Sequence, residues 1–385
     1  MRLTLVTETF APQVNGVSRT LGQLVDHMER AGDEVQVIHP DYGEDSTRPH
    51  DIRVRSHALP FYREVIVPIP PFGKAHRAID AFRPDVVHVA TEVTLGLSAL
   101  RYSLRKSIPT VSSFHTNFDQ YCDHYHVGWA KPAAWRYLRW FHNRTRETYV
   151  PSMATIRDLE ARGFERLVLW PRGVDGRLFR PDRPDRARLR EALGFGPDHV
   201  VIGHVSRLAA EKNVGHLVKA LREVGEARPQ VRFLFVGDGP ARAELEAEMG
   251  EKARFVGYQG GEALADHYAA ADLFAFASLT ETFGNVVLEA LASGLPTVAI
   301  RAGGVGEIVR PGETGILVEP ADPPSQMAGA LIGLVDDPTL RREMAQAART
   351  YALGQTWEAI MGRLRERYLA VASADRDDPV PTSAV

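Results

Sequence analysis

Short apolar runs alternate with longer segments in which apolar residues recur every three or four positions, and this alternation continues through the whole chain. Short apolar runs are typical of buried parallel strands, and the longer spacing is typical of helices that pack on a sheet. The first half is predicted to contain strands at Leu3–Thr7, Val35–Ile38, Val86–Val89, Thr110–Ser113 and Thr148–Val150, with helices at Ser18–Ala31, Val93–Arg105, Ala133–Glu147 and Ser152–Arg162.

The second half restarts the same pattern. Its predicted strands are Val200–His204, Arg232–Val236, Arg254–Val256, Leu273–Ala277, Thr297–Ile300 and Gly315–Val318, and its predicted helices are Val214–Ala227, Ala241–Met249, Val286–Ala292 and Pro338–Tyr351. Prolines and glycines crowd residues 171–185, which places a domain boundary there. The sequence therefore predicts an α/β protein with two doubly wound domains, 1–175 and 176–355, and a charged, disordered tail at 372–385.

Composition limits the function classes. At 385 residues the chain exceeds what one core usually covers, which agrees with two domains. The net charge of −3, with Lys and Arg scattered, argues against a nucleic-acid partner. The single cysteine, Cys122, excludes an internal disulfide framework and fits a reducing compartment. The N-terminal apolar stretch meets Glu8 too early for a signal peptide, and no run approaches a membrane-spanning length. We expect a cytoplasmic protein whose membrane contact is peripheral.

One segment carries two carboxylates in a strand, loop and helix context. Glu281 follows an apolar strand, at the edge where open α/β sheets place ligands. Glu289 lies about two helical turns further on, and Gly284 would let a ligand approach backbone N–H groups. Spacing alone also fits a simpler interpretation, in which Glu281 caps the helix and Glu289 is a solvated side chain.

Three further loops follow predicted strands. Arg207 and Lys212 could converge on a diphosphate, although two basic residues in a polar loop are common. The turn Asn15-Gly16 opens a backbone surface for a phosphate at a helix N-terminus, although a plain strand-to-helix turn looks the same. His115 follows another strand, where a lone histidine is usually a structural group.

These segments together resemble the family 4 retaining glycosyltransferases, which have the GT-B fold with the active site in the cleft between two Rossmann-like domains. The matching motifs are T-E-T-F-G-N-V-V-L-E-A-L-A-S-G-L-P-T-V-A, which contains the E-x7-E element, R-L-A-A-E-K-N with Ser206 before it where glycine is usual, and P-Q-V-N-G-V-S-R. The resemblance covers essentially the whole chain. It implies an N-terminal acceptor-binding domain, a C-terminal donor-binding domain, and a final helix, 356–371, that packs back on the first domain.

The resemblance also implies roles for individual residues. Catalytic contacts would come from His115, Glu281, Arg207 and Lys212; donor contacts from Gly16, Arg207, Lys212, Gly257, Tyr258, Glu281, Phe283, Gly284, Asn285, Val286 and Glu289; and acceptor contacts from Asn15, Gly16, His115 and Asn117. The only D-x-D triplet, Asp375-Arg376-Asp377, lies in the tail, so we expect no metal and no other cofactor.

The basic and aromatic segment 129–146 has two interpretations. It suits a helix that touches anionic lipid or a lipid-linked acceptor, through which the N-terminal domain would contact the inner face of the membrane. It equally suits a helix whose aromatic residues face the core while its arginines reach solvent.

Within the family, E-T-F-A-P-Q-V-N-G-V and Arg172-Gly173-Val174-Asp175 resemble GDP-mannose-dependent α-mannosyltransferases that act on glycolipids. The predicted function is therefore retaining transfer of a hexose, in the first place mannose from GDP-mannose, to a lipid or glycolipid. A UDP-sugar-dependent transferase of the glucosyl or sulfoquinovosyl type remains an alternative. So do a GT-B-fold nucleotide-sugar epimerase and a non-catalytic nucleotide-sugar-binding protein.

Overall fold

The computed structural model describes residues 1–13, 15–43, 50–59, 62–115 and 131–374. Its contacts divide the chain into two compact units. Unit 1 comprises Met1–Pro171 and Ile360–Val385, and unit 2 comprises Arg172–Ala359. The division thus lies at one end of the predicted Pro- and Gly-rich stretch, and the end of the chain returns to the first unit.

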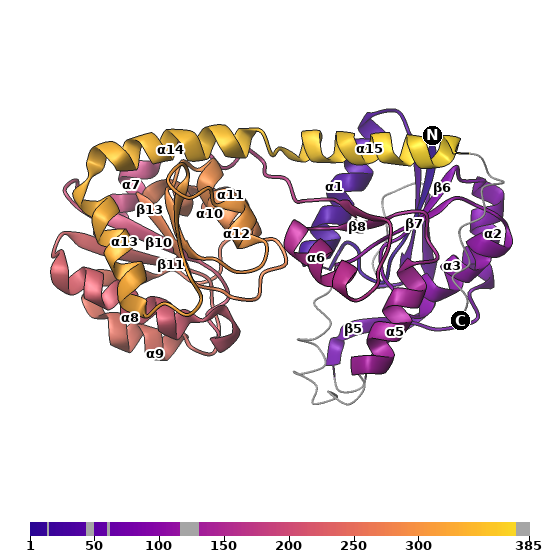
Figure 1. Ribbon diagram of the computed structural model, residues 1–385, viewed down its shortest axis with the longest axis horizontal. Coiled ribbons are helices and arrows are strands. Elements are labelled where there is room, and N and C mark those ends of the chain that lie inside the picture. Colours follow the sequence, from indigo (N-terminus) through magenta and orange to yellow (C-terminus); the bar gives the residue numbers. More distant parts are fainter. Residues whose placement is uncertain (14, 44–49, 60–61, 116–130, 375–385) are drawn as a thin grey trace. The chain divides into compact units, whose positions relative to one another are not determined.

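The sheet of unit 1 has seven parallel strands in the order β3-β2-β1-β6-β7-β8-β9. These are β1 (Arg2–Val6), β2 (Glu34–Pro40), β3 (Asp51–Val54), β6 (Val86–Val89), β7 (Thr110–Ser113), β8 (Thr148–Val150) and β9 (Leu167–Leu169). Strands β6, β7 and β8 are labelled in Figure 1. The strands β4 (Ser56–Leu59) and β5 (Tyr62–Pro68) form a separate antiparallel pair. The helices are α1 (Gly16–Arg30), α2 (Gly73–Phe82), α3 (Thr94–Arg105), α5 (Lys131–His142), α6 (Met153–Ala161) and most of α15 (Trp357–Ser373).

The sheet of unit 2 has six parallel strands in the order β12-β11-β10-β13-β14-β15. These are β10 (Val200–Val205), β11 (Val231–Val236), β12 (Ala253–Phe255), β13 (Leu273–Phe276), β14 (Thr297–Ile300) and β15 (Gly315–Val318). The helices are α7 (Arg186–Ala192), α8 (Val214–Ala227), α9 (Arg242–Met249), α10 (Gly261–Ala270), α11 (Asn285–Ala292), α12 (Val305–Ile308), α13 (Pro324–Asp336) and α14 (Pro338–Leu353), with short 3-10 turns η2 (Ala210–Lys212) and η3 (Gly250–Lys252).

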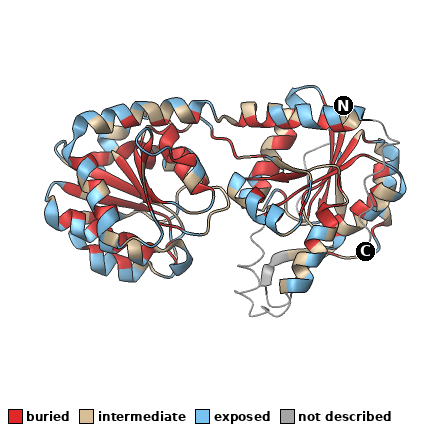
Figure 2. Ribbon diagram, viewed as in Figure 1, coloured by how far each residue is buried: buried red, intermediate tan, exposed pale blue. Residues whose placement is uncertain are grey.

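Apolar cores lie on both faces of the second sheet. On one face, strand residues pack with α8, α9 and α13, and on the other with α10, α11 and α14. In the first unit, α2, α3 and α5 cover one face of the sheet. Figure 2 shows the consequence, because the strands are almost wholly buried while the outer helix faces are exposed. Burial on both sides explains why these strands appear in the sequence as continuous apolar runs.

Every predicted strand is present in the structure, so the apolar runs were interpreted correctly. The pattern missed the short strands β3 and β9, the β4–β5 pair, and the helices α2, α7, α10, α12 and α13. The predicted helix Ala133–Glu147 was too long, because α5 ends at His142, where the Thr145 hydroxyl donates to the His142 carbonyl at 2.8 Å. The predicted tail also began too early, since α15 continues to Ser373; residues 375–385 lie outside the described part of the chain.

Candidate functional site

The strand order of the second sheet reverses between β10 and β13, and ligands of doubly wound sheets bind where such a reversal occurs. The chain leaving β10 carries Lys212, and the chain leaving β13 carries Glu281. The Lys212 Nζ atom lies 2.5 Å from Glu281 Oε1, and each side chain keeps about a quarter of its surface exposed. The structure therefore brings these two predicted site residues together at the switch point.

Neighbouring hydrogen bonds hold the two loops in register. Asn213, in the left-handed conformation with φ 53°, donates from Nδ2 to the Ala277 carbonyl at 3.3 Å. The Thr280 hydroxyl donates to the Glu211 carbonyl at 3.4 Å. Both bonds join the end of η2 to the loop after β13, so the Lys212–Glu281 contact rests on a supported backbone.

Gly284, not Glu281, is the N-cap of α11, so the interpretation of Glu281 as a helix cap is wrong. Gly284 has φ 102°, and a Cβ there would lie 2.8 Å from a Val305 methyl group, so the fold itself requires glycine. The Glu281 carbonyl accepts from the Gly304 N–H at 3.0 Å, and a Cβ on Gly303 would approach that carbonyl to 2.2 Å. This close backbone contact was not predicted, although the pair Gly303-Gly304 shortly after β14 could have indicated it.

Glu289 is buried, with 5 % of its surface exposed, so the solvated interpretation is also wrong. The Tyr268 hydroxyl, from α10, lies 3.2 Å from Glu289 Oε2 and 3.1 Å from the Val286 carbonyl oxygen. Phe283 and Val286 are partly buried against the same core, and Asn285 opens α11. A buried carboxylate is costly unless it is hydrogen-bonded, and the tyrosine hydroxyl supplies such a bond. Tyr268 gave no signal in the sequence.

Arg207 is exposed and forms an i,i+4 ion pair with Glu211 at 3.3 Å. Before it, His204 is buried, which lowers its pKa to about 4 and keeps it neutral. Its Nδ1 donates to the Ala275 carbonyl at 2.9 Å, so Nε2 must be the unprotonated nitrogen. That nitrogen lies 2.7 Å from Ser206 Oγ, and this contact positions the residue that precedes Arg207.

The predicted residues Gly257 and Tyr258 follow β12. The Gly237 N–H, at the end of β11, donates to the Gly257 carbonyl at 2.8 Å. A Cβ on Gly237 would lie 1.9 Å from the Ser206 carbonyl oxygen, so the turns after β10, β11 and β12 are in close backbone contact. Tyr258 projects from this group of turns with 75 % of its surface exposed. An exposed aromatic ring beside backbone polar groups suits the stacking of a base.

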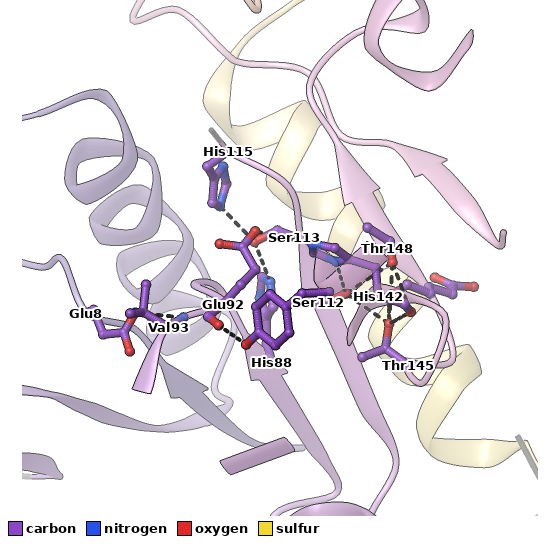
Figure 3. Close-up of polar contacts among 12 residues, drawn as sticks. Glu8, His88, Glu92, Val93, Ser112, Ser113, His115, His142, Thr145 and Thr148 are labelled. Atoms are coloured by element: carbon purple, nitrogen blue, oxygen red, sulfur yellow. Dashed lines mark hydrogen bonds and ion pairs between the residues drawn. The ribbon is translucent and has the colours of Figure 1, made fainter. Parts of the chain in front are cut away.

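In unit 1 the strand order reverses between β1 and β6, and Glu8, a partly buried glutamate that was not among the predicted site residues, lies there. Glu8 follows β1, and its carboxylate accepts from the backbone N–H groups of Leu95 at 2.8 Å, Gly96 at 3.4 Å and Val93 at 3.2 Å. Figure 3 shows the contact with Val93. Burial raises the pKa of Glu8, whereas these hydrogen bonds act in the opposite direction. The carboxylate thus occupies the N-terminus of α3 and fixes the start of the loop that leads to α1.

The rest of that loop is held by side-chain hydrogen bonds. Asn15 caps α1, with its Oδ1 accepting from the Ser18 N–H at 2.8 Å and its Nδ2 donating to Thr9 Oγ1 at 2.7 Å. A Cβ on Gly16 would meet no atom within 4 Å. Among the described residues, the N–H groups of Gly16 and Val17 have no hydrogen-bond acceptor. The N-terminus of α1 therefore keeps N–H donors for an anion, and no packing contact requires glycine at position 16.

His115 lies just beyond β7, partly buried, with its Nε2 atom 2.7 Å from Ser113 Oγ. Ser113 Oγ is also 2.9 Å from Nε2 of the buried His88 on β6 (Figure 3). Trp170 packs edge-on against both rings. The predicted acceptor residue Asn117 lies outside the described residues.

The aromatic side chains of α5 mostly pack inward. Leu138 and Phe141 are buried, and Trp135 stacks near Phe114 under the Arg162 guanidinium. The described residues therefore fit the packing interpretation of this segment. In the described part of the chain, no helix combines the length and apolar character needed to cross a membrane. The same residues contain no group of three His, Cys, Asp or Glu side chains that could hold a metal ion.

Comparisons with known proteins agree with this geometry. Residues 14–177 match the family model described as Glycosyltransferase Family 4, and residues 199–337 match the model described as Glycosyl transferases group 1. The chain is similar to a GDP-mannose-dependent alpha-mannosyltransferase of Mycobacterium tuberculosis, with 37 % identity over 96 % of this chain and 97 % of that protein. It is also similar to the sulfoquinovosyl transferase SQD2 of Arabidopsis thaliana, with 33 % identity over 93 % of this chain and 71 % of that protein.

Among solved structures, sucrose-phosphate synthase from Thermosynechococcus elongatus superposes with a TM-score of 0.77 over 97 % of this chain and 100 % of that chain, at 23 % identity. At that identity the likeness concerns the fold alone. The predicted architecture of two Rossmann-like α/β halves of the GT-B type is confirmed.

Proposed function

The chain belongs to glycosyltransferase family 4, and from this membership we propose that it transfers mannose from GDP-mannose to a lipid or glycolipid acceptor with retention of configuration. The observation that carries the donor assignment is the 37 % identity, over nearly the full length of both chains, to a protein named for GDP-mannose-dependent mannosyl transfer. The geometry at the switch point of unit 2 supports glycosyl transfer as the reaction.

In this proposal unit 2 binds the donor. Lys212 and Arg207 lie on the chain that leaves β10, and their charges meet the diphosphate. Glu281 forms an ion pair with Lys212 at 2.5 Å. When the phosphate binds Lys212, Glu281 is released to accept hydrogen bonds from the hydroxyls of the sugar. Tyr258 stacks on the base.

Glu289 is proposed to bind the ribose of the donor. Its carboxylate is buried and hydrogen-bonded by Tyr268, so its orientation is set before the ligand arrives. Asn285 and Val286, in the first turn of α11, would lie beside the ribose and the phosphate of the nucleotide. A preformed site of this kind binds its ligand with little ordering cost.

The proposed chemistry needs no nucleophile from the protein. The acceptor oxygen attacks C1 of the sugar on the face that the diphosphate leaves, the bond from C1 to the phosphate oxygen breaks, and the departing oxygen takes the acceptor proton. The protein stabilises the negative charge that develops on the leaving group, through Lys212 and Arg207. We propose that these cations do the work that a metal ion does in other transferases, so that no metal is required.

Unit 1 is proposed to bind the acceptor through Asn15, Gly16 and His115, with peripheral contact to the inner face of the membrane. The N–H groups of Gly16 and Val17, which have no acceptor among the described residues, suit a phosphate or a sugar hydroxyl. Arg136 and Arg139 of α5 are exposed while Phe141 is buried, which suits contact with anionic lipid without insertion.

A UDP-sugar donor is the second candidate, and the similarity to the sulfoquinovosyl transferase SQD2 favours it. The two candidates differ in the base and in the sugar, whereas the contacts to the diphosphate are shared. An epimerase or a non-catalytic binding protein would use the same donor contacts without an acceptor.

The full-length chain should be titrated with GDP-mannose, UDP-glucose, UDP-galactose and UDP-GlcNAc, with binding followed by saturation-transfer NMR. Vesicles that contain diacylglycerol or a glucosylated diacylglycerol should then be supplied with each donor, and the product anomer read by NMR. The proposal expects tight binding of GDP-mannose alone and an α-linked product. Selective binding of UDP-glucose would replace it with the second candidate, and epimer formation without acceptor would reject transfer.

A further inference from the structure

A continuous line of buried polar atoms joins the last helix to the end of β7. The Tyr368 hydroxyl on α15 lies 2.8 Å from Nδ1 of His88, and Nε2 of His88 lies 2.9 Å from Ser113 Oγ. Ser113 Oγ in turn lies 2.7 Å from Nε2 of His115 (Figure 3 shows the last two of these contacts). Tyr368, His88 and Ser113 have no measurable exposed surface.

The direction of each hydrogen bond follows from where protons can go. Burial raises the pKa of Tyr368 well above its usual value, so the hydroxyl keeps its proton. Among the described residues, the one partner of this hydroxyl is His88 Nδ1, and a buried O–H without an acceptor is avoided in folded proteins. Tyr368 therefore donates to His88.

The protonation state of His88 sets the direction of the next hydrogen bond. Burial lowers its pKa to about 3, so the ring is neutral and carries one proton. Because Nδ1 accepts from Tyr368, the proton is on Nε2 and is donated to Ser113 Oγ. The serine hydroxyl then has one remaining partner for its own proton among the described residues, which is His115 Nε2.

We infer that Tyr368, His88 and Ser113 form a relay of positioning residues that fixes the tautomer of the histidine after β7. His115 is held with Nε2 as an acceptor, and its proton is placed on Nδ1. The role of this relay in catalysis rests on the proposed function. In that reaction Nε2 of His115 is occupied by the Ser113 hydroxyl and does not take the acceptor proton, so any hydrogen bond that the ring gives to a sugar or acceptor oxygen comes from Nδ1.

The relay also gives the C-terminal helix a part in the reaction. Tyr368 comes from α15, which is far from His115 in the sequence, and the helix is tied to the same unit by the Arg365–Asp33 ion pair at 2.6 Å. Undocking α15 would remove the first donor of the relay, and the tautomer of His115 would no longer be fixed.

The test uses the full-length chain labelled with 15N-histidine, and long-range 1H–15N correlation spectra report which ring nitrogen carries the proton. The His115 signals are assigned by their absence in His115→Asn. We expect the wild type to show His115 protonated on Nδ1. Ser113→Ala should raise the Nε2-protonated form and lower kcat for mannosyl transfer about tenfold, because an oriented donor is lost for part of the molecules. Tyr368→Phe should shift the same signals in the same direction.

Ser112→Ala is the matched control. Ser112 is the adjacent, equally buried residue of β7, but its hydroxyl lies 2.9 Å from His142 Nδ1 in a separate network that also contains Thr145 and Thr148 (Figure 3). Its spectrum at His115 should match the wild type. A wild-type His115 protonated on Nε2, or a Ser113→Ala variant with an unchanged tautomer, would overturn the relay. A wild type that shows the expected tautomer but transfers no sugar would reject the proposed function and leave the relay standing.

Discussion

Replacing Gly16 with alanine should change function without disturbing the fold. Gly16 is the first residue of α1, its backbone has no positive φ, and a Cβ there meets no atom within 4 Å. Alanine has a higher helix propensity than glycine, by up to about 1 kcal/mol per residue. The free energy of unfolding of Gly16→Ala should therefore be unchanged or slightly higher.

The transfer activity of Gly16→Ala should be lower than that of the wild type. The N–H groups of Gly16 and Val17 have no acceptor among the described residues, so a bound anion can approach them closely only while position 16 lacks a Cβ. Alanine keeps both N–H groups, but its methyl group would hold the anion away from them, and losing one such contact to a developing negative charge costs about 3 kcal/mol, or roughly a hundredfold in rate. We expect Gly16→Ala to lower kcat/KM for mannosyl transfer by about that factor.

Gly22→Ala is the control, because Gly22 lies in the same helix and a Cβ there also meets nothing within 4 Å. Urea unfolding and transfer to glycolipid vesicles should be measured for both variants. Gly22→Ala should be as stable as Gly16→Ala or more so, with wild-type kcat/KM. If Gly16→Ala were stable and fully active, the anion-binding role of the α1 N-terminus would be refuted.

Three other predictions concern the donor contacts and pH. Lys212→Ala should lower kcat about a hundredfold, because a contact to the diphosphate is lost. Lys219→Ala makes the same charge change on the exposed face of α8 and should leave kcat unchanged. Equal rates for the two variants would contradict the phosphate role of Lys212. Transfer should persist in excess EDTA, and loss of turnover that Mg²⁺ or Mn²⁺ restores would reject metal independence. The free energy of unfolding should decrease as the pH is lowered from about 6.5, by about 1.4 kcal/mol per pH unit for each of two buried histidines. Burial lowers the pKa of His88 to about 3 and of His204 to about 4, so in this range only the unfolded chain takes up those protons. Urea midpoints that stay level from about pH 6.5 to 5 would contradict this.

Much of the site could be located from the sequence because parallel sheets place their ligands at strand ends. Apolar runs identified β10 and β13, and the residues after them, Lys212 and Glu281, proved to be in contact. The same logic identified Asn15 and Gly16 after β1. Position along the chain was sufficient in these cases, since the carboxyl ends of parallel strands share one edge of the sheet.

The sequence by itself determined the two α/β units, their strands and the loops that carry the candidate residues, because local hydrophobic period and turn residues encode these features. It could not determine which buried polar groups meet. Tyr268 and Glu289 are 21 residues apart in the chain, Tyr368 and His88 are 280 residues apart, and all four look like ordinary core or helix residues in the sequence. Only the packing of helices on the sheets brings them within hydrogen-bond distance, and in the buried interior each donor must then find an acceptor.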